Sequence, residues 1–310
     1  MELSVLLSTR DRAPLLASTL EHLCRQEGLP AGRWEVLVVD NGSRDDTPAV
    51  LGRFASRLPL VALRQPQGGK SHALNRALEV ARGALRVFTD DDVEPRPSWL
   101  AELLAASRRW PDHPVFGGRI IPRYPAETPD WLRDLVREHP EYASAAYAHY
   151  SLPQEEGPTE DLPFGPNYAV RAQAMTGLRF CEDIGPVGKD YPMGEDTDML
   201  IRLTRRGVPA IYVPGAMVYH VVRPDQLQPS WLLGRAYRLG RGTLRLRVAT
   251  LGQPLPPAWK AWLRLPLAWA LYGRERFRGP GRRLLAGVSI HFLRGYLLEH
   301  SRLRAERAGS

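Results

Sequence analysis

Short apolar runs alternate with helical patterns over roughly the first 120 residues, and this alternation limits the possible folds most strongly. The apolar runs are rich in β-forming residues and each ends in a polar turn, at residues 4–8, 35–39, 60–63 and 85–89. Helical patterns follow them, at residues 14–25, 46–57, 71–81 and 98–109. Such repetition predicts an α/β fold with a mostly parallel sheet and helices on both faces. Ligands of these sheets bind beyond the carboxyl ends of the strands.

The later part of the chain is less regular, and its composition changes near residue 223. Residues 122–166 are rich in Pro, Glu and aromatic residues and predict loops and short helices. Strand or helix patterns then resume, at residues 167–175, 195–206 and 210–213. From Arg223 onward there are 17 Lys and Arg against 4 Asp and Glu, so this part has a charge of +13 and the rest −5. We therefore predict an α/β domain over residues 1–222 and a basic helical region over residues 223–310.

Arginines interleaved with Leu, Trp and Tyr fill the basic region. Its longest uncharged apolar runs, residues 265–273 and 284–293, are shorter than the ~20 residues that cross a bilayer. The pattern favours an amphipathic helix on a surface instead. The charge asymmetry indicates an anionic partner, and because no nucleic-acid motif is present we favour a lipid surface over a nucleic acid. The alternatives are that this region covers part of a binding site, forms an oligomer or is simply a solvated, Arg-rich face.

Cysteine usage and the first residues bear on the compartment. Two cysteines, Cys24 and Cys181, are too few for a disulfide framework. The first residues lack the basic start and apolar stretch of a signal peptide. We therefore expect a cytoplasmic protein, in peripheral contact with the inner face of the membrane where the basic region docks.

The sequence Phe88-Thr89-Asp90-Asp91-Asp92-Val93 places three acids directly after an apolar strand. Adjacent carboxylates raise each other's pKa, so a positive partner is expected beside them. Mg²⁺ and Mn²⁺ commonly bridge carboxylates to the phosphates of a substrate. The triplet therefore predicts a metal site, and a solvated acidic turn is the alternative.

A second acidic segment, Gly194-Glu195-Asp196-Thr197-Asp198, opens a predicted helix. Acids in a first helical turn interact favourably with the helix dipole, which is the simpler interpretation. A carboxylate held at this position can also act as a general base.

Three other residues lie where a ligand of the sheet would bind. Lys70 follows Gly68 and Gly69 before a helix, an arrangement that suits either a phosphate or a tight turn. Asp40 ends the second strand ahead of Asn41-Gly42, where it can accept a hydrogen bond from a nucleoside or begin a turn. His220 follows a late strand and is either a ligand or a structural histidine.

In their order along the chain, these segments resemble the family 2 glycosyltransferases of the GT-A fold. The resemblance spans roughly residues 3–222 and rests on six segments, at residues 5–12, 38–43, 90–92, 164–171, 194–207 and 212–220. They resemble the nucleotide loop, the base-reading strand, the D-x-D motif, the acceptor-side segment, the E-D helix and the closing segment. The implied fold is that of the nucleotide-diphospho-sugar transferases: a Rossmann-like, mixed and mostly parallel sheet flanked by helices. Residues 1–222 would be the catalytic domain, with the basic helical region as an extension.

The resemblance also implies a role for each site residue. Asp196 would be the catalytic base, with Glu195 orienting it or binding the acceptor. A Mn²⁺ or Mg²⁺ ion would be held by Asp90, Asp92 and His220. The nucleotide would be bound by Thr9, Arg12, Asp40, Lys70, Asn75, Asp90 and Asp91.

The implied activity is inverting transfer of a single sugar from a nucleotide sugar, with a UDP-sugar favoured. The acceptor would be a glycan, a lipid-linked glycan or a small molecule, in glycan or cell-envelope assembly. The sequence lacks the Gln-x-x-Arg-Trp pattern of processive polysaccharide synthases. A sugar-1-phosphate nucleotidyltransferase is one alternative, but Ser8-Thr9-Arg10-Asp11-Arg12 replaces the Gly-rich basic loop that such an enzyme carries. A catalytically inert nucleotide-sugar or lipid-binding module is another, and intact Asp92 and Asp196 argue against it.

Overall fold

The structure, a computed structural model, describes residues 1–29, 32–188, 190–205 and 207–308. The chain forms two compact units that interleave along the sequence. The first unit comprises Met1–Arg123, Tyr147–Glu182 and Asp196–Val221. The second comprises Tyr124–Ala146, Asp183–Glu195 and Val222–Ser310. The predicted boundary at residues 222 and 223 lies beside Val222, where the chain enters the second unit for the last time. The two earlier segments of the second unit were not predicted.

The first unit is built on a sheet with the strand order β3-β2-β1-β4-β8-β6-β9-β5, and β7 pairs with β9. The strands are β1 (Leu3–Thr9), β2 (Trp34–Asp40), β3 (Leu60–Arg64), β4 (Leu85–Phe88), β5 (Val93–Pro95), β6 (Val115–Arg123), β7 (Gly157–Thr159), β8 (Tyr168–Arg171) and β9 (Ala210–Val221). The predicted strands β1 to β4 are parallel. Beyond them β8 runs antiparallel to both β4 and β6, so this half of the sheet is mixed. The predicted α/β class is confirmed, and the sheet is less parallel than expected.

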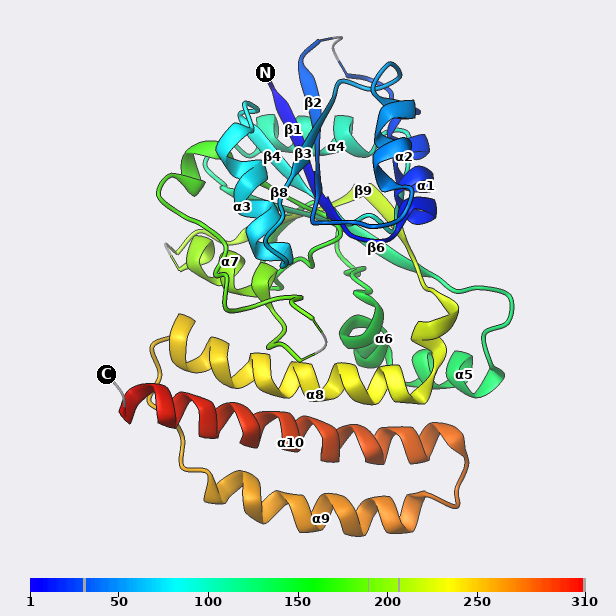
Figure 1. Cartoon of the computed structure of the whole chain (residues 1–310), viewed down its shortest axis with the longest axis vertical. Coiled ribbons are helices and arrows are strands. Elements are labelled where there is room, and N and C mark those ends of the chain that lie inside the picture. The colour runs from blue at the N-terminus through cyan, green and yellow to red at the C-terminus, as the bar shows by residue number, and fades with distance from the viewer. Residues whose placement is uncertain (30–31, 189, 206, 309–310) are drawn as a thin grey trace. The chain divides into compact units, whose positions relative to one another are not determined.

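Helices cover both faces of this sheet because successive strand residues point to opposite sides. The helices are α1 (Ala13–Leu23), α2 (Thr47–Phe54), α3 (Lys70–Val80), α4 (Trp99–Arg109) and α7 (Glu195–Thr204). Val5 and Leu7 pack in one core with residues of α1, α2 and α4. Leu6, between them, packs in the other core with residues of α3 and α7. In Figure 1, α1 and α2 accordingly lie on one side of the strands and α3 on the other. The predicted helix at 195–206 is confirmed as far as Thr204, and Arg206 lies outside the described residues.

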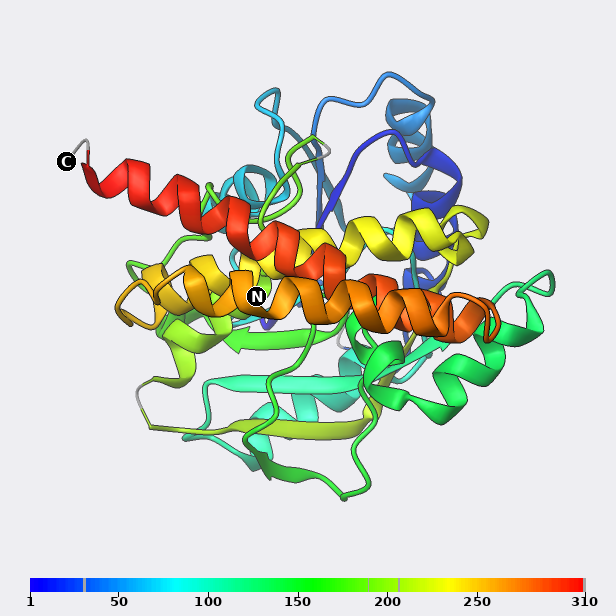
Figure 2. The same cartoon turned by 90° about the horizontal axis from the view of Figure 1, so that it is seen from below.

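The second unit is helical. Its main helices are α5 (Asp130–Glu138), α6 (Pro140–Tyr147), α8 (Pro229–Arg245), α9 (Trp259–Glu275) and α10 (Pro280–Ala308). Helix α10 packs on α8 and on α9 and lies between them (Figures 1 and 2). The backbones of α8 and α10 approach closely, because a Cβ atom on Gly240 would lie 2.1 Å from the Phe292 carbonyl oxygen. A Cβ atom on Gly295 would lie 1.9 Å from the Tyr237 carbonyl oxygen. Within the described part of the chain, no helix has the length and apolar character to cross a membrane.

Candidate active site

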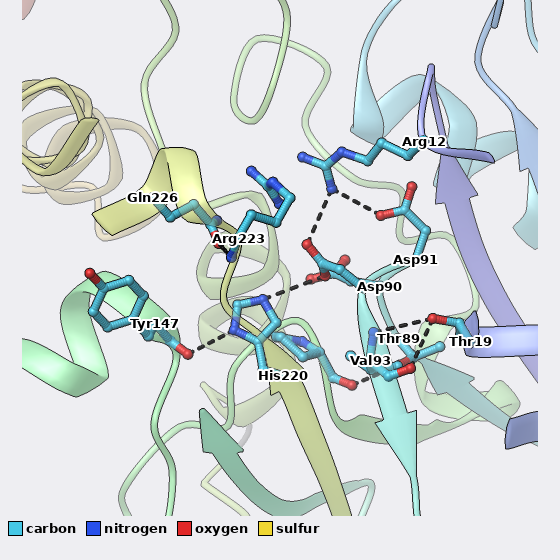
Figure 3. A network of polar contacts seen from close by, with 12 residues as sticks. Arg12, Thr19, Thr89, Asp90, Asp91, Val93, Tyr147, His220, Arg223 and Gln226 are labelled. Atoms are coloured by element: carbon cyan, nitrogen blue, oxygen red, sulfur yellow. Dashed lines mark hydrogen bonds and ion pairs between the residues drawn. The ribbon is translucent and has the colours of Figure 1, made fainter. Parts of the chain in front are cut away.

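The acidic triplet lies where β4 ends, at the carboxyl edge of the parallel strands, and it has the positive partner that its charge requires. Asp91 is 3% exposed and accepts hydrogen bonds from Thr9 Oγ1 at 2.7 Å and from Arg12 Nη1 at 2.9 Å. Thr9 ends β1. Arg12 lies in the loop that follows and points toward Asp91 (Figure 3). Arg12 Nη1 is also 3.3 Å from Asp92 Oδ2, so one guanidinium pairs with two neighbouring carboxylates.

The burial of these charges shifts their proton affinities. Burial raises the pKa of the Asp91 carboxyl to about 6, against the opposing effect of the Arg12 charge. Burial by itself would lower the pKa of Arg12, but the charges of Asp91 and Asp92 outweigh burial and raise it. Thr9, Arg12 and Asp91 therefore form one polar network at the edge of the sheet.

His220 reaches the same edge from β9. Its Nε2 atom lies 3.4 Å from Asp92 Oδ1, and its Nδ1 atom is 2.9 Å from the Tyr147 carbonyl oxygen, to which it donates (Figure 3). Burial alone lowers the pKa of this imidazole, but the Asp92 carboxylate outweighs burial and raises it. Donation by Nδ1 to a backbone carbonyl fixes the ring and turns Nε2 toward Asp92.

Asp90, Asp92 and His220 are the predicted metal ligands, and the structure offers oxygen and imidazole donors at one edge. Among the residues that the structure describes, no three His, Cys, Asp or Glu side chains form a group that could hold a metal ion. In this structure Lys70 pairs with Asp90, and Arg12 pairs with Asp92. A divalent ion that binds substrate phosphates needs only one or two protein carboxylates, because phosphate oxygens and water complete its shell. The donors therefore fit an ion shared with a phosphorylated ligand, and the metal role stays a prediction.

Lys70 joins the acidic triplet to Asp196. Its Nζ atom lies 2.9 Å from Asp90 Oδ1 and 3.2 Å from Asp196 Oδ2. Lys70 is the first residue of α3, and Asp196 lies in the first turn of α7. The other oxygen of Asp196, Oδ1, accepts a hydrogen bond from the Tyr168 hydroxyl at 3.1 Å. Two residues that are 126 positions apart are thus fixed within one charged cluster.

Gly165 leaves just enough room for the Asp196 carboxylate. A Cβ atom on Gly165 would lie 2.2 Å from Asp196 Oδ2 and 3.3 Å from Lys70 Nζ. Carboxylate oxygens at the end of a side chain can swing away, but Asp196 would then lose the positions that bring it to Lys70 and Tyr168. Gly165 therefore sets the place of this carboxylate.

If Asp196 is the base that the resemblance implies, we expect Gly165→Ala to keep the fold and to lower turnover by about 10²-fold, the typical cost of misplacing a reacting group by 1 Å. Turnover is measured as release of nucleoside diphosphate from the donor. Gly157→Ala is the matched control, because a Cβ atom there would meet nothing within 4 Å. Equal turnover of the two variants would show that Asp196 does not need this position.

Asp40 and the loops around it form the predicted nucleotide side. Asp40 is 8% exposed, and its Oδ1 accepts a hydrogen bond from the Ser43 backbone N–H at 2.8 Å. Asp11, in the loop after β1, has a positive φ of 51° and accepts from the Arg44 N–H at 2.7 Å. The loops after β1 and β2 are therefore held together beside Asp40, whose role toward a base stays a prediction.

Two other predicted residues, Asn75 and Glu195, contact further parts of the chain. Both N–H donors of the Asn75 amide are used, one by the Phe180 carbonyl and one by Glu182, each at 3.0 Å. Its oxygen accepts from the Phe180 N–H at 2.8 Å, so Asn75 braces the segment at residues 180–182, and its role toward a nucleotide stays a prediction. Glu195 belongs to the second unit, where it is 7% exposed and packs against Gly185. Its predicted role beside Asp196 stays a prediction.

Sequence reasoning missed Tyr168, Gly165 and Thr89. Thr89 Oγ1 donates to the Pro166 carbonyl at 2.8 Å and so anchors the segment that carries Gly165. The signal for Tyr168 and Gly165 was the segment at 164–171, which the resemblance assigned to the acceptor side without selecting a residue, and Thr89 was quoted beside the acidic triplet without a role.

An α/β sheet whose strand ends gather carboxylates, an arginine and a lysine is typical of a site for phosphorylated ligands. The sequence model of the family described as Glycosyl transferase family 2 matches residues 4–175, more than half of the chain. The chain therefore belongs to glycosyl transferase family 2, as the order of its six segments predicted. Family membership places it among the glycosyltransferases.

Relatives and solved structures agree with this family. Glycosyltransferase AglE of Haloferax volcanii is 24% identical over 219 residues, which are 70% of this chain and 65% of AglE. Beta-monoglucosyldiacylglycerol synthase of a Nostoc species is 31% identical over 110 residues, 34% of this chain and 23% of the synthase. The chain thus spans less than two thirds of either relative.

Two solved proteins share the fold over nearly the whole chain. The mannosyltransferase PcManGT of Pyrobaculum calidifontis, solved with GDP-Man and Mn²⁺, is 22% identical with a TM-score of 0.59, and the match covers 98% of this chain and 87% of PcManGT. Residues 1–349 of S. aureus TarS, solved with UDP-GlcNAc, are 15% identical with a TM-score of 0.56, over 99% and 92% of the two chains. The predicted GT-A fold is therefore confirmed.

Proposed function

We propose that this protein transfers a single sugar from a nucleoside-diphosphate sugar to an acceptor hydroxyl, with inversion at the anomeric carbon. One observation carries the proposal: Lys70 lies within 2.9 Å of Asp90 in the acidic triplet and within 3.2 Å of Asp196. The candidate base therefore lies beside the carboxylates that would face the donor diphosphate. A base at this position can take the acceptor proton while the nucleotide leaves, and no covalent enzyme intermediate is needed.

Each cluster residue has a chemical task in this proposal. Asp196 accepts the proton of the acceptor hydroxyl, and Tyr168 and Gly165 hold its carboxylate in place. Lys70 pairs with both Asp90 and Asp196 in the free protein, and a donor diphosphate would compete for the same ammonium. Arg12 keeps Asp91 and Asp92 together, and Asp40 contacts the nucleoside.

Asp90 and Asp92, with His220 behind Asp92, are the residues that would hold a divalent cation. When bound, Mn²⁺ or Mg²⁺ would neutralise the charge that develops on the leaving diphosphate. PcManGT was solved with Mn²⁺, which supports a divalent ion for this fold. Asp92 is the ligand we expect to matter most, because it contacts both Arg12 and His220.

We propose the donor and the acceptor from the family resemblance. The expected donor is a UDP-sugar, and TarS and PcManGT, which bind UDP-GlcNAc and GDP-Man, give two nucleotides to test. The acceptor is a glycan, a lipid-linked glycan or a small molecule in glycan or cell-envelope assembly. The basic region from residue 223 is proposed to contact an anionic membrane surface from the cytoplasmic side.

The proposal is tested by thermal shifts with UDP-, GDP- and dTDP-sugars, each with Mn²⁺ or with chelator. A donor at 100 times its Kd should stabilise the fold by about 2.7 kcal/mol. We expect one nucleotide to give a shift that chelator reduces, and Asp92→Ala to lose the metal-dependent part of that shift. Asp112→Ala, an exposed acid of the same unit, is the control and should keep it.

Two results would count against this function. Equal donor shifts with Mn²⁺ and with chelator would remove the metal assignment at Asp92. A donor shift without any release of nucleoside diphosphate, with a range of acceptors, would favour a binding module that is catalytically inert.

A further inference from the structure

Exposed apolar side chains concentrate on one helix of the second unit. Ten large hydrophobic side chains are exposed among the described residues, and eight of them lie between residues 251 and 277. Six of the eight belong to α9: Trp259, Trp262, Leu263, Leu267, Trp269 and Leu271. Leu263 is 68% exposed and Leu267 is 62% exposed, whereas leucine is among the residues most often buried. Such a concentrated apolar patch indicates a surface that contacts something apolar.

The exposed side chains form a continuous face of α9. Residues three and four positions apart share a helix face, which aligns Trp259, Trp262, Leu263 and Leu267. The opposite face carries Ala261 and Ala268, which are 6% and 5% exposed. That face packs on α10, which lies between α9 and α8 (Figure 2). Helix α9 is therefore apolar on both faces, and one of them is covered by the second unit itself.

The charges around this face select the chemistry of its partner. Residues 256–283 contain seven Lys and Arg and one acid, Glu275. Glu275 is already paired with Arg274 at 2.8 Å and with Arg278 at 3.5 Å, and its side chain is only 12% exposed. Lys260 and Arg264 are exposed along α9 itself. The face is thus apolar with a strongly positive margin, which complements an anionic surface.

A second copy of this chain is a poorer occupant of the face than an anionic lipid surface. Two α9 faces brought together would place the same basic margins against each other, and like charges repel. Anionic lipid headgroups attract each nearby Lys or Arg by about 1 kcal/mol, which is about a fivefold gain in binding per residue. Tryptophan is also the residue that prefers the boundary between lipid and water, and three of the six exposed side chains are tryptophans.

We infer that α9 is the element that docks this protein on an anionic lipid surface, an inference that rests on the membrane contact proposed above and assigns it to one helix face. Helix α9 lies in the plane of the interface, with Trp262, Leu263 and Leu267 below the headgroups. Lys260 and Arg264 remain among the headgroups, because long basic side chains reach outward to polar surroundings. This is the behaviour of an interfacial amphipathic helix.

The test measures co-sedimentation of the full chain with vesicles of phosphatidylcholine alone and of phosphatidylcholine with about one third phosphatidylglycerol. The variant Leu263→Ser with Leu267→Ser removes two inserted side chains. The matched control is Val187→Ser, an exposed apolar residue of the same unit, 44% exposed, outside α9. We expect binding to the anionic vesicles only, a loss of at least roughly tenfold in the double variant, and no loss in the control. Brominated lipids should quench the tryptophan fluorescence of the parent protein.

Three results separate this inference from the function proposed above. Equal binding of the parent and the double variant would keep the membrane contact and overturn the assignment to α9. A parent that fails to bind vesicles and forms dimers that the double variant lacks would show that a second copy covers the face. The donor thermal shift is measured on the same proteins without vesicles, so its loss would count against the transferase function alone.

Discussion

Replacing Asp196 by Asn is expected to lower turnover by about 10²–10⁴-fold while leaving donor binding nearly unchanged. The amide has nearly the shape of the carboxylate, so it can still accept the hydrogen bond that Tyr168 donates at 3.1 Å. The amide cannot take up the proton of the acceptor hydroxyl. Because the amide is neutral, it also no longer attracts the Lys70 ammonium. The donor thermal shift and the release of nucleoside diphosphate are measured on the same preparation.

Asp198→Asn is the control that separates a base from an acid that merely favours the start of α7. Asp198 lies two residues further along the helix, is 4% exposed and pairs with Arg202 at 2.6 Å. We expect this variant to lose stability and to keep its turnover at a temperature where it is folded. If Asp196→Asn kept full turnover, or if both variants lost it equally, Asp196 would not be the base. The anomeric configuration of the product, read by NMR, tests inversion independently.

The parallel half of the sheet was predictable because its signals are local. The run at residues 4–8 predicted β1, and the helical pattern at 71–81 predicted α3, with bounds within a residue of those observed. Strand β6 gave no such signal, because Gly117, Gly118 and Pro122 interrupt its apolar pattern. Gly118 is needed there, since a Cβ atom would lie 2.2 Å from the Ala216 carbonyl oxygen. That requirement comes from a neighbouring strand and is not visible in a local window.

The site shows the same division between local and distant signals. The acidic triplet was predictable because three acids directly after an apolar strand must lie at a strand end. The bridge that Lys70 makes to Asp196 was not predictable, because it depends on α3 and α7 beginning at the same edge of the sheet. The contacts of Asn75 with Phe180 and Glu182 were equally unpredictable, because they join residues more than 100 positions apart.

The basic region contains a buried ion network between α8 and α10, which a count of its charged residues does not reveal. Arg241 is 2% exposed, and its Nε atom donates to Glu299 Oε2 at 2.8 Å, across 58 positions of sequence. Glu299 is fully buried and also binds Arg245, and Arg241 reaches Asp190 at 2.5 Å. The composition shows only that these residues are charged. The packing of the helices shows that they form ion pairs inside the second unit.

Replacing Glu299 by Ala should therefore lower the free energy of unfolding by about 3–5 kcal/mol, because it leaves the buried Arg241 guanidinium without its fully buried carboxylate partner. Glu306→Ala is the matched control, since Glu306 pairs with the same Arg245 but is 55% exposed. Exposed pairs contribute about 0–1 kcal/mol, so this variant should be nearly as stable as the parent. Denaturant unfolding followed by circular dichroism measures both.

The double variant Arg241→Met with Glu299→Leu tests whether the buried ion pair contributes net stability or whether the single variant loses stability only because one charge is left unpaired. Removing both charges replaces the buried pair with apolar side chains, and such replacements are often neutral or stabilising. We expect the double variant to regain most of the stability that Glu299→Ala loses. A loss as large as that of the single variant would mean that the ion network itself, rather than the penalty of one unpaired charge, holds α8 against α10. That result would make the pairing of Arg241 with Glu299 a source of net stability in this unit.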